Sequence, residues 1–351
     1  MKQNERGAVW PDAIEGVEDL EECLSRPSPG AIEDLAALEG DLLVLGAGGK
    51  MGPSLARMAR RALDASGRSG EVVAVSRFGD GASRACLESA GVRTLAVDLL
   101  DPTALAELPE AAAVLFLVGT KFGTTDDTAH TWAVNASLPQ LVAERFAGVP
   151  TVVFSSGNVY PFTPVESRGA REDTPPAPVG EYAQSVLARE RAFEERSVSD
   201  GTPALLFRLN YAAELRYGVL VDVARRVLEG EPVDLAMGWL NVIWQGDACA
   251  AALRCIRLCA SPPMILNITG PELVAVRELA QAFGERFGRG PIFRGREGDT
   301  ALLSDATRAV ERFGPPRIST ERLIDWTAAW LRAGGESWDK PTGFERRDGA
   351  F

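Results

Sequence analysis

Three of the four glycines at residues 46–52 constrain the fold of this chain more than any other feature of its sequence. They directly follow the apolar run 42–45, and an amphipathic segment begins after them. A dinucleotide-binding turn needs glycine where the backbone bends, where it approaches the pyrophosphate, and where the helix packs on the strand. Gly46, Gly49 and Gly52 occupy these places, whereas GxGxxG spacing would put its third glycine at Met51.

A glycine turn between a strand and a helix can be purely structural, but the flanking strand and helix patterns favour a cofactor site. The pyrophosphate would lie on free N–H groups of the helix N-terminus. We expect Gly48, Lys50 and Met51 to contact the cofactor together with the three spaced glycines.

Short apolar runs alternate with longer amphipathic segments from residue 41 onward, which is typical of βαβ units. The predicted fold class is α/β: a Rossmann-type, doubly wound parallel sheet with a smaller C-terminal α/β substrate domain. Strands are expected at 41–45, 71–76, 93–97, 113–118, 151–155, 204–209 and 264–269. Helices are expected at 53–65, 128–146, 219–229, 246–258, 274–287 and 320–333.

Four segments follow from these patterns. Residues 1–40 form a helical extension, with helices at 13–24 and 31–38 separated by the breaker residues 27–30. Residues 41–212 form the dinucleotide-binding domain, to which the chain returns near 242–260, and residues 213–332 form the substrate domain. Residues 333–351 lack periodicity, so this tail is either loose or held on a neighbouring surface.

Composition excludes several function classes. The chain has 351 residues, of which 46% are hydrophobic, and a formal charge of −12, so nucleic acid and anionic membranes are poor partners. Because no apolar run approaches the roughly 18 residues of a membrane span, we expect a cytoplasmic protein. Five cysteines without a CxxC pair and the single His130 predict no metal site.

The ends of the next strands predict which cofactor binds. An NAD site usually places an acidic residue after the second strand, but this chain has Ser76 and Arg77 there. Arg77 could pair with a 2′-phosphate, which favours NADP over NAD, although it could also be a solvated surface arginine. Asp98 and Leu99, after the third strand, are expected near the adenine. Val118 and Gly119, after the fourth strand, and Tyr182, further along the chain, complete the predicted cofactor contacts.

Several motifs in order resemble the extended short-chain dehydrogenase/reductases, the group that contains NAD-dependent epimerases and dehydratases. The resemblance spans residues 41 to about 331. It is carried by the glycine turn and by the segments FSSGNVY at 154–160, YAQSV at 182–186, RLN at 208–210, WQGD at 244–247 and LNITG at 266–270.

The resemblance implies that Ser156 hydrogen-bonds a substrate oxygen while Tyr182 moves its proton. Charge that builds on that oxygen must be neutralised by a nearby acid, which explains the pairing. The chain departs from the family at Val186, where the family has the lysine that lowers the tyrosine pKa. A phenol without a nearby cation has a pKa near 10 and is a poor base.

Three outcomes remain open at this point: the enzyme compensates, it uses other chemistry, or it only binds the cofactor. Lys121, after the fourth strand, is our hypothesis for compensation, because ligands bind at this edge of doubly wound sheets. The alternative, to which we give equal weight, is that Lys121 is a solvated lysine in a loop.

A second departure concerns the substrate. Nucleotide-sugar enzymes of the family usually have a diphosphate-binding arginine seven residues before Asp247, where this chain has Leu240. We therefore expect a smaller substrate, such as a free sugar, sugar acid or lactone. Asn158 and Asn210 are expected to contact it, with Tyr211 beside them and Arg216 and Tyr217 as further candidates to line its pocket.

The predicted function is an NAD(P)-dependent oxidoreductase or epimerase acting on a hydroxyl or ketone of such a molecule. The alternatives are a non-catalytic cofactor-binding sensor or scaffold, and a dehydratase or lyase that uses its cofactor transiently. Since members of the family often pair through the helix that carries the tyrosine, a homodimer is also expected.

Overall fold

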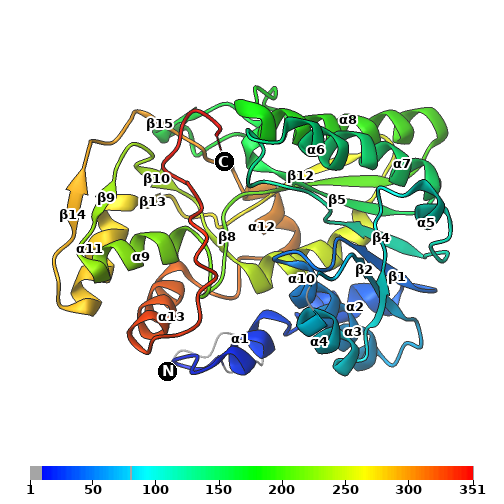
Figure 1. Cartoon of the computed structure of the whole chain (residues 1–351), viewed down its shortest axis with the longest axis horizontal. Coiled ribbons are helices and arrows are strands. Elements are labelled where there is room, and N and C mark those ends of the chain that lie inside the picture. The colour runs from blue at the N-terminus through cyan, green and yellow to red at the C-terminus, as the bar shows by residue number, and fades with distance from the viewer. Residues whose placement is uncertain (1–9, 80, 351) are drawn as a thin grey trace.

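The computed structural model describes residues 10–79 and 81–350, and its centre is a seven-stranded sheet (Figure 1). The strands lie in the order β12-β7-β5-β4-β1-β2-β3, and every neighbouring pair is parallel. The predicted Rossmann-type α/β fold is therefore confirmed. The strand bounds are β1 Leu42–Leu45, β2 Val72–Ser76, β3 Arg93–Ala96, β4 Ala113–Phe116, β5 Thr151–Ser156, β7 Ala204–Leu209 and β12 Met264–Ile268.

The strand order reverses at β1, which lies between β2 and β4. The register pairs Leu45 with both Val75 and Phe116, so the three strands end together at one edge of the sheet. In open parallel sheets the ligand crevice lies outside the carboxyl ends of the strands at this switch point. The glycine turn after β1 is therefore at the position where a dinucleotide would bind.

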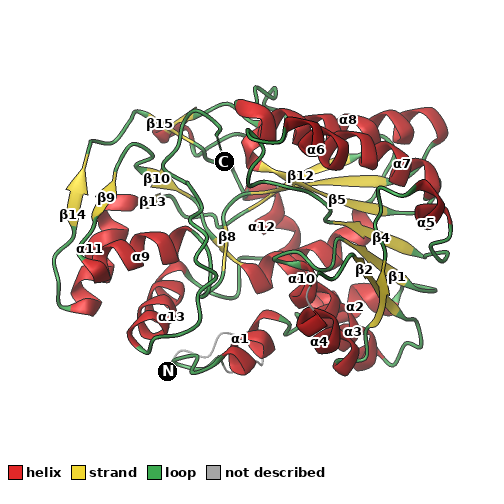
Figure 2. Ribbon diagram, viewed as in Figure 1, coloured by secondary structure: helices red, strands yellow, loops and turns green. Residues whose placement is uncertain are grey.

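Helices cover both faces of the sheet (Figure 2). Alternate residues of β1 point to opposite faces, with Leu42 and Val44 in one core and Leu43 and Leu45 in the other. The first core is closed by α2 Pro29–Ala36, α3 Gly52–Ser66 and α10 Gln245–Cys255. The second is closed by α5 Pro102–Ala106, α7 Leu138–Arg145 and α8 Gly180–Asp200.

A third core lies beside the sheet and contains Trp244, Trp326 and Phe283. Its helices are α1 Val17–Leu24, α9 Val219–Glu229, α11 Val276–Phe287 and α13 Thr320–Arg332, with the strands β9 Pro232–Asp234 and β14 Ile292–Arg294 nearby. The other short elements are α4 Gly81–Ser89, α6 Thr128–Trp132, α12 Thr307–Phe313, β6 Thr163–Pro164, β8 Ala212–Ala213, β10 Trp239–Leu240, β11 Ile243–Trp244, β13 Val274–Ala275 and β15 Thr300–Ala301. Leu20 and Leu24 of α1 join this third core while α2 joins the first, so the N-terminal helices connect the two.

Several predicted segments differ in detail. The helix predicted at 274–287 begins only at Val276, after the short strand β13. The segment 128–146 is not one regular helix, because a π-helical turn at Ala133–Ser137 separates α6 from α7. The predicted break at 27–30 is too long, since Pro29 and Gly30 belong to the first turn of α2. Ser28 caps that helix by accepting a hydrogen bond from the N–H of Ala31 at 3.1 Å, and proline fits a first helical turn because its missing N–H has no partner there.

The tail segment, defined as residues 334–350, contains no helix or strand but is held on the rest of the molecule. Arg347 donates to the carbonyl oxygen of Thr300 at 2.8 Å, and Arg226 pairs with Glu345 at 2.7 Å. Phe344 is 3% exposed and belongs to the third core. The sequence leaves open whether the tail is loose or held on a neighbouring surface, and the structure shows that it is held.

None of the helices in the described part of the chain combines the length and apolarity needed to cross a membrane. Within the same residues no cluster of His, Cys, Asp and Glu has the arrangement of a metal site.

Candidate active site

The glycine turn is shaped by close backbone contacts. Gly46 has φ +89°, and a Cβ there would lie 2.8 Å from the backbone nitrogen of Val118. A Cβ on Gly52 would lie 2.4 Å from the carbonyl oxygen of Ala47. A Cβ on Gly49, in contrast, meets only one backbone oxygen within 4 Å, at 3.4 Å. Gly46 and Gly52 are therefore required by the fold, while Gly49 leaves backbone open toward the cleft, as a bound pyrophosphate requires.

The residues beyond the turn that are predicted to contact the cofactor differ in their burial and in their neighbours. Ser76, at the end of β2, lies against Gly48, where an added Cβ would be 2.5 Å from the serine Oγ. Arg77 is exposed. Asp98 is exposed and accepts a hydrogen bond from the N–H of Leu100, and Leu99 is buried in the core beneath the sheet. Ser76 thus borders the turn, whereas Leu99 packs in the interior.

A cleft with a cavity volume of about 290 Å³ runs from the glycine turn across the ends of the strands. Its lining comes from the turn, from the ends of β4, β5 and β7, and from the start of α9. No Asp or Glu is among the described residues that line it: Gly46, Gly49, Lys50, Met51, Gly52, Leu117, Gly119, Lys121, Phe154, Ser155, Ser156, Asn158, Tyr182, Leu209, Asn210, Tyr211, Ala212, Tyr217, Gly218, Val219 and Thr342.

Ser156 and Tyr182 meet in this cleft. The hydroxyl of Ser156, at the end of β5, is hydrogen-bonded to the Tyr182 side chain on α8. Ser156 also donates to Oδ1 of Asn158 at 3.1 Å and accepts from the N–H of Asn158 at 3.2 Å. Burial raises the pKa of Tyr182, while the positive charge of Arg189 and the Ser156 hydrogen bond oppose that rise. The pair is thus arranged to contact one oxygen atom in the cleft.

Arg189 is a residue that the sequence reasoning missed. It follows Tyr182 by seven residues on α8, which is two helical turns, so both side chains are on the same face. Its guanidinium donates to the carbonyl oxygen of Phe154 at 2.7 Å and to Oδ1 of Asn135 at 2.9 Å. Gly119 makes room for it, since a Cβ there would lie 2.5 Å from Nη2 of Arg189. The i, i+7 spacing was the signal that could have revealed it.

Val186 lies between these two residues on the helix. It is 1% exposed and packs in a small apolar cluster with Val159, Tyr160 and Ala170. Val186 is thus part of the core, and the charge near Tyr182 comes from Arg189, one turn further along.

Two lysines line the same cleft. Lys50 donates to the carbonyl oxygen of Ala212 at 2.7 Å and lies 4.4 Å from the ring centre of Tyr217. Burial lowers its pKa to about 8; the carboxylate of Glu214 opposes this effect, and the charge of Lys121 adds to it. Lys50 and Lys121 are therefore close enough to repel each other.

Lys121, the second of these lysines, is covered by the tail segment. Its Nζ is 3.4 Å from the carbonyl oxygen of Thr342. Burial lowers the pKa of Lys121 to about 8 against the opposing charge of Asp222. Asp222 is itself bound through Oδ2 by the N–H and the hydroxyl of Thr342 at 2.7 and 2.6 Å. The tail thus forms part of the wall around Lys121.

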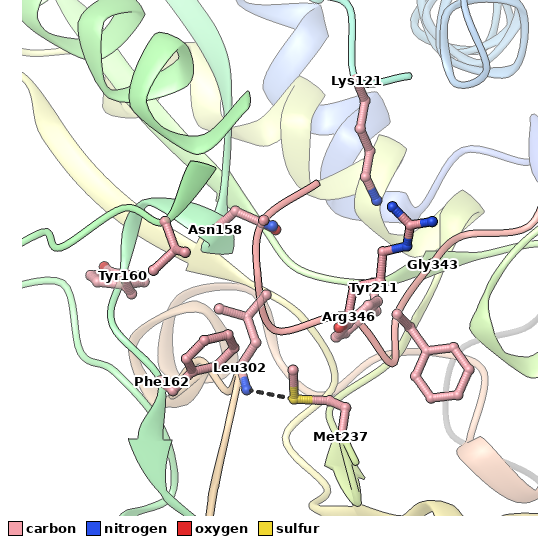
Figure 3. Close-up of a pocket in the computed structure, with 12 residues that line it drawn as sticks. Lys121, Asn158, Tyr160, Phe162, Tyr211, Met237, Leu302, Gly343 and Arg346 are labelled. Carbon is pink, nitrogen blue, oxygen red and sulfur yellow. Dashed lines mark hydrogen bonds between the residues drawn. The ribbon is translucent and has the colours of Figure 1, made fainter. Parts of the chain in front are cut away.

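Beyond Lys121 the tail borders a second, much smaller space, the tail pocket, with a cavity volume of about 30 Å³ (Figure 3). It shares Lys121, Asn158 and Tyr211 with the cleft, so the two spaces adjoin. Its lining residues are Lys121, Asn158, Tyr160, Phe162, Val179, Tyr211, Met237, Leu302, Gly343, Phe344, Arg346 and Gly349.

The other predicted substrate residues are close to this boundary. Asn210 lines the cleft but is 2% exposed, and its amide donates to the carbonyl oxygen of Leu302 at 3.2 Å. Tyr211, with φ +44°, lines both spaces. Tyr217 lines the cleft and stacks on Trp338 of the tail.

Leu240 and Arg216 are placed away from the cleft lining. Leu240 is fully buried in the third core and belongs to the short strand β10. Arg216 pairs with Glu214 and with Glu21 of α1 at 2.9 and 2.7 Å. Its guanidinium is therefore already held by two carboxylates.

The parallel sheet, the glycine turn at its switch point and the adjoining hydroxyl pair define a Rossmann-type enzyme. The model of the NAD dependent epimerase/dehydratase family matches residues 42–268. The chain belongs to this family and is an enzyme of its type. No curated protein matches the chain in sequence.

Solved structures share the fold. UDP-glucose 4-epimerase from Thermotoga maritima, with UDP-glucose, is 19% identical with a TM-score of 0.69 over 84% of this chain and 99% of that one. UDP-glucuronic acid 4-epimerase from Bacillus cereus, with UDP-glucuronic acid and NAD, is 16% identical with a TM-score of 0.68 over 83% and 99%. MoeE5, with UDP-glucose and NAD, is 22% identical with a TM-score of 0.67 over 84% and 99%.

Proposed function

We propose that this enzyme is an NAD(P)-dependent oxidoreductase or epimerase acting on a hydroxyl or ketone of a small carbohydrate-like molecule: a sugar, sugar acid or lactone. The observation that carries the proposal is the hydrogen-bonded pair of Ser156 and Tyr182 in a cleft that begins at the glycine turn. The cofactor, when bound, supplies the redox chemistry at the substrate carbon.

Side chains of the protein bind the substrate oxygen and transfer its proton. Ser156 holds the substrate oxygen, and Tyr182 gives a proton to that oxygen or removes one from it. Because burial raises the pKa of Tyr182, the phenol is better suited to donating a proton to a ketone than to removing one from an alcohol. Arg189 supplies positive charge near Tyr182 in place of the lysine replaced by Val186, and Lys121 lines the same cleft, which supports the compensated enzyme over the non-catalytic alternative.

The substrate we propose is smaller than the nucleotide sugars that the similar structures bind. Leu240 is buried where the family has its diphosphate-binding arginine, so this contact has no counterpart. The tail segment covers the cleft next to Lys121 and occupies space on its far side. Both features favour a molecule without a nucleotide.

For the cofactor we propose NADP in preference to NAD. The residue directly after β2 is Arg77 rather than an acid that could bind a ribose 2′-hydroxyl, and Arg77 is exposed beside Ser76, which borders the turn. Gly46, Gly48, Gly49, Lys50, Met51 and Gly52 hold the pyrophosphate end in this proposal, with Val118 and Gly119 further along the cleft.

The test is purified protein mixed with NADP or NAD and a panel of sugars, sugar acids and lactones, followed by cofactor absorbance and product isomerisation. Tyr182→Phe should lower turnover by about 100-fold or more while cofactor binding persists. Full activity in this variant would refute the mechanism. Cofactor binding without any turnover in the unmodified protein would instead indicate a sensor or scaffold. Product formation without net cofactor change would indicate an epimerase, dehydratase or lyase.

A further inference from the structure

Phe78 has a backbone conformation that its side chain disfavours. Its φ is +45°, in the left-handed region, where the Cβ of a bulky residue comes too close to the carbonyl oxygen. Glycine would adopt this conformation at no such cost. Strain of this kind persists only where the surrounding structure enforces it, and it is concentrated at sites that bind ligands. Phe78 is therefore a candidate for ligand binding.

Phe78 follows the point where the carboxyl ends of β1, β2 and β3 meet. The carbonyl oxygen of Val75, near the end of β2, accepts a hydrogen bond from the N–H of Gly46 at 2.9 Å, so β2 passes directly beside the glycine turn. On the other side the carbonyl oxygen of Ser76 accepts from the N–H of Val97, just after β3, at 2.9 Å. The chain leaves the sheet between these two contacts and reaches Phe78 two residues later.

The ring of Phe78 is partly exposed and lies beside the turn. It packs against the first core, and a Cβ on Gly48 would lie 3.8 Å from its Cδ1. Gly48 is itself exposed. Packing on the core thus fixes the ring, while part of its surface remains open next to the turn that we propose holds the pyrophosphate.

This position fits the adenine of a bound dinucleotide. In Rossmann-type sites the end of β2 contacts the adenosine ribose, which is the basis of the role proposed for Arg77. Because the adenine is bonded to the same ribose, it must lie close to that contact. Leu99, which the sequence predicts near the adenine, is buried in the core and offers it no surface. Phe78, one residue after Arg77, offers an aromatic surface instead.

We propose that Phe78 provides the surface on which the adenine of the cofactor stacks, and that its left-handed backbone holds the ring beside the glycine turn. This inference rests on the proposed function and deepens its cofactor site. Offset stacking on an aromatic ring is favourable for a base, so Phe78 contributes equally to the binding of NAD and NADP. Arg77 then selects NADP through its 2′-phosphate.

The test is calorimetric titration of the full chain with NADP, NAD and adenosine 2′,5′-bisphosphate, all of which contain adenine. Phe78→Gly removes the ring but accepts the left-handed backbone, so Arg77 keeps its place. We expect this variant to bind each ligand at least about fivefold more weakly, since the stacking of a base on an aromatic side chain commonly contributes that much. Phe78→Tyr retains an aromatic ring and should keep the affinity.

Phe78→Leu separates stacking on the adenine from packing on the core, because leucine can pack on the first core but has no ring. It should melt close to the unmodified protein and bind all three ligands more weakly. Phe293→Leu is the matched control: it is the same substitution at a partly buried phenylalanine on β14, and it should leave the three affinities unchanged. Unchanged affinity in Phe78→Gly, or full affinity in Phe78→Leu, would overturn the proposal and leave Phe78 as an anchor of the core.

The three ligands distinguish the remaining outcomes. A loss in Phe78→Gly that is confined to NADP and the bisphosphate would overturn the proposal, because it would trace to the 2′-phosphate and not to the adenine. An unmodified protein that binds none of the three ligands would refute the cofactor site and this proposal together. Binding that depends on Phe78 in a protein without turnover would support this proposal and refute only the proposed reaction.

Discussion

Arg189 and Tyr182 lie two turns apart on one face of α8, and the charge of the guanidinium lowers the pKa of the phenol against the opposite effect of burial. Burial lowers the pKa of Arg189 itself to about 10, which leaves it charged at neutral pH. A cation thus acts on the tyrosine although Val186 cannot supply one.

Replacing Arg189 by methionine should therefore move the pH profile of the reaction. Without the cation the phenol pKa rises further, so we expect the pH of half-maximal alcohol oxidation to increase by about one unit. Arg189→Lys should restore most of the original profile. The measurement is kcat/KM against pH for each variant; a purely structural role would lower activity and leave the midpoint unchanged.

The glycine turn predicts opposite outcomes at two of its positions. Gly52→Ala forces a Cβ to 2.4 Å from a backbone oxygen and should destabilise the fold by about 2 kcal/mol or more. Gly49→Ala meets only ordinary contacts, so the protein should fold normally but bind cofactor at least about tenfold more weakly. Thermal melting and cofactor titration separate the two effects. Gly290→Ala, in open space, is the control, and intact cofactor binding in Gly49→Ala would contradict the proposed site.

The cofactor preference depends on Arg77. Its replacement by glutamine should weaken NADP binding by about tenfold and leave NAD binding unchanged, because only NADP has a 2′-phosphate. Dissociation constants for both cofactors give the answer. Equal weakening of both, or of neither, would mean that Arg77 is a solvated surface residue.

A buried ion pair should fix α8 to the sheet. Arg208 on β7 forms two hydrogen bonds with Glu190 on α8, at 2.8 and 2.6 Å, and both side chains are at most 3% exposed. Glu190→Gln leaves an uncompensated buried charge, so we expect a loss of about 3 kcal/mol in the free energy of unfolding. Glu194→Gln, in an exposed pair on the same helix, should lose less than about 1 kcal/mol in urea unfolding. Similar losses for both variants would disprove the distinction.

The strands and the glycine turn could be predicted from sequence because their signals are local. A buried parallel strand needs a short apolar run, and the turn needs glycine at fixed intervals, so β1 and its neighbours follow directly from the pattern. Lys121 was placed at the carboxyl edge of the sheet, where ligands bind, by the same reasoning, because it directly follows a predicted strand. The π-helical turn between α6 and α7 has no such signal.

The contacts between distant segments could not be predicted. The tail has no periodicity, and the bonds that hold it join it to residues far away in sequence, as between Thr342 and Asp222. Lys121 and Thr342 likewise meet only through the fold. Leu99 shows the reverse case: its place after a strand suggested a ligand contact, but its apolar side chain is buried in the core.

The attachment of the tail ties the wall of the cleft to the packing of the third core. Arg347 contacts Thr300 of β15, Glu345 pairs with Arg226 of α9, and Phe344 is buried in the third core. A designer who exchanges the tail segment to reshape the cleft would therefore have to keep these three anchors. In such a protein the wall of the cleft and the interior have to change together.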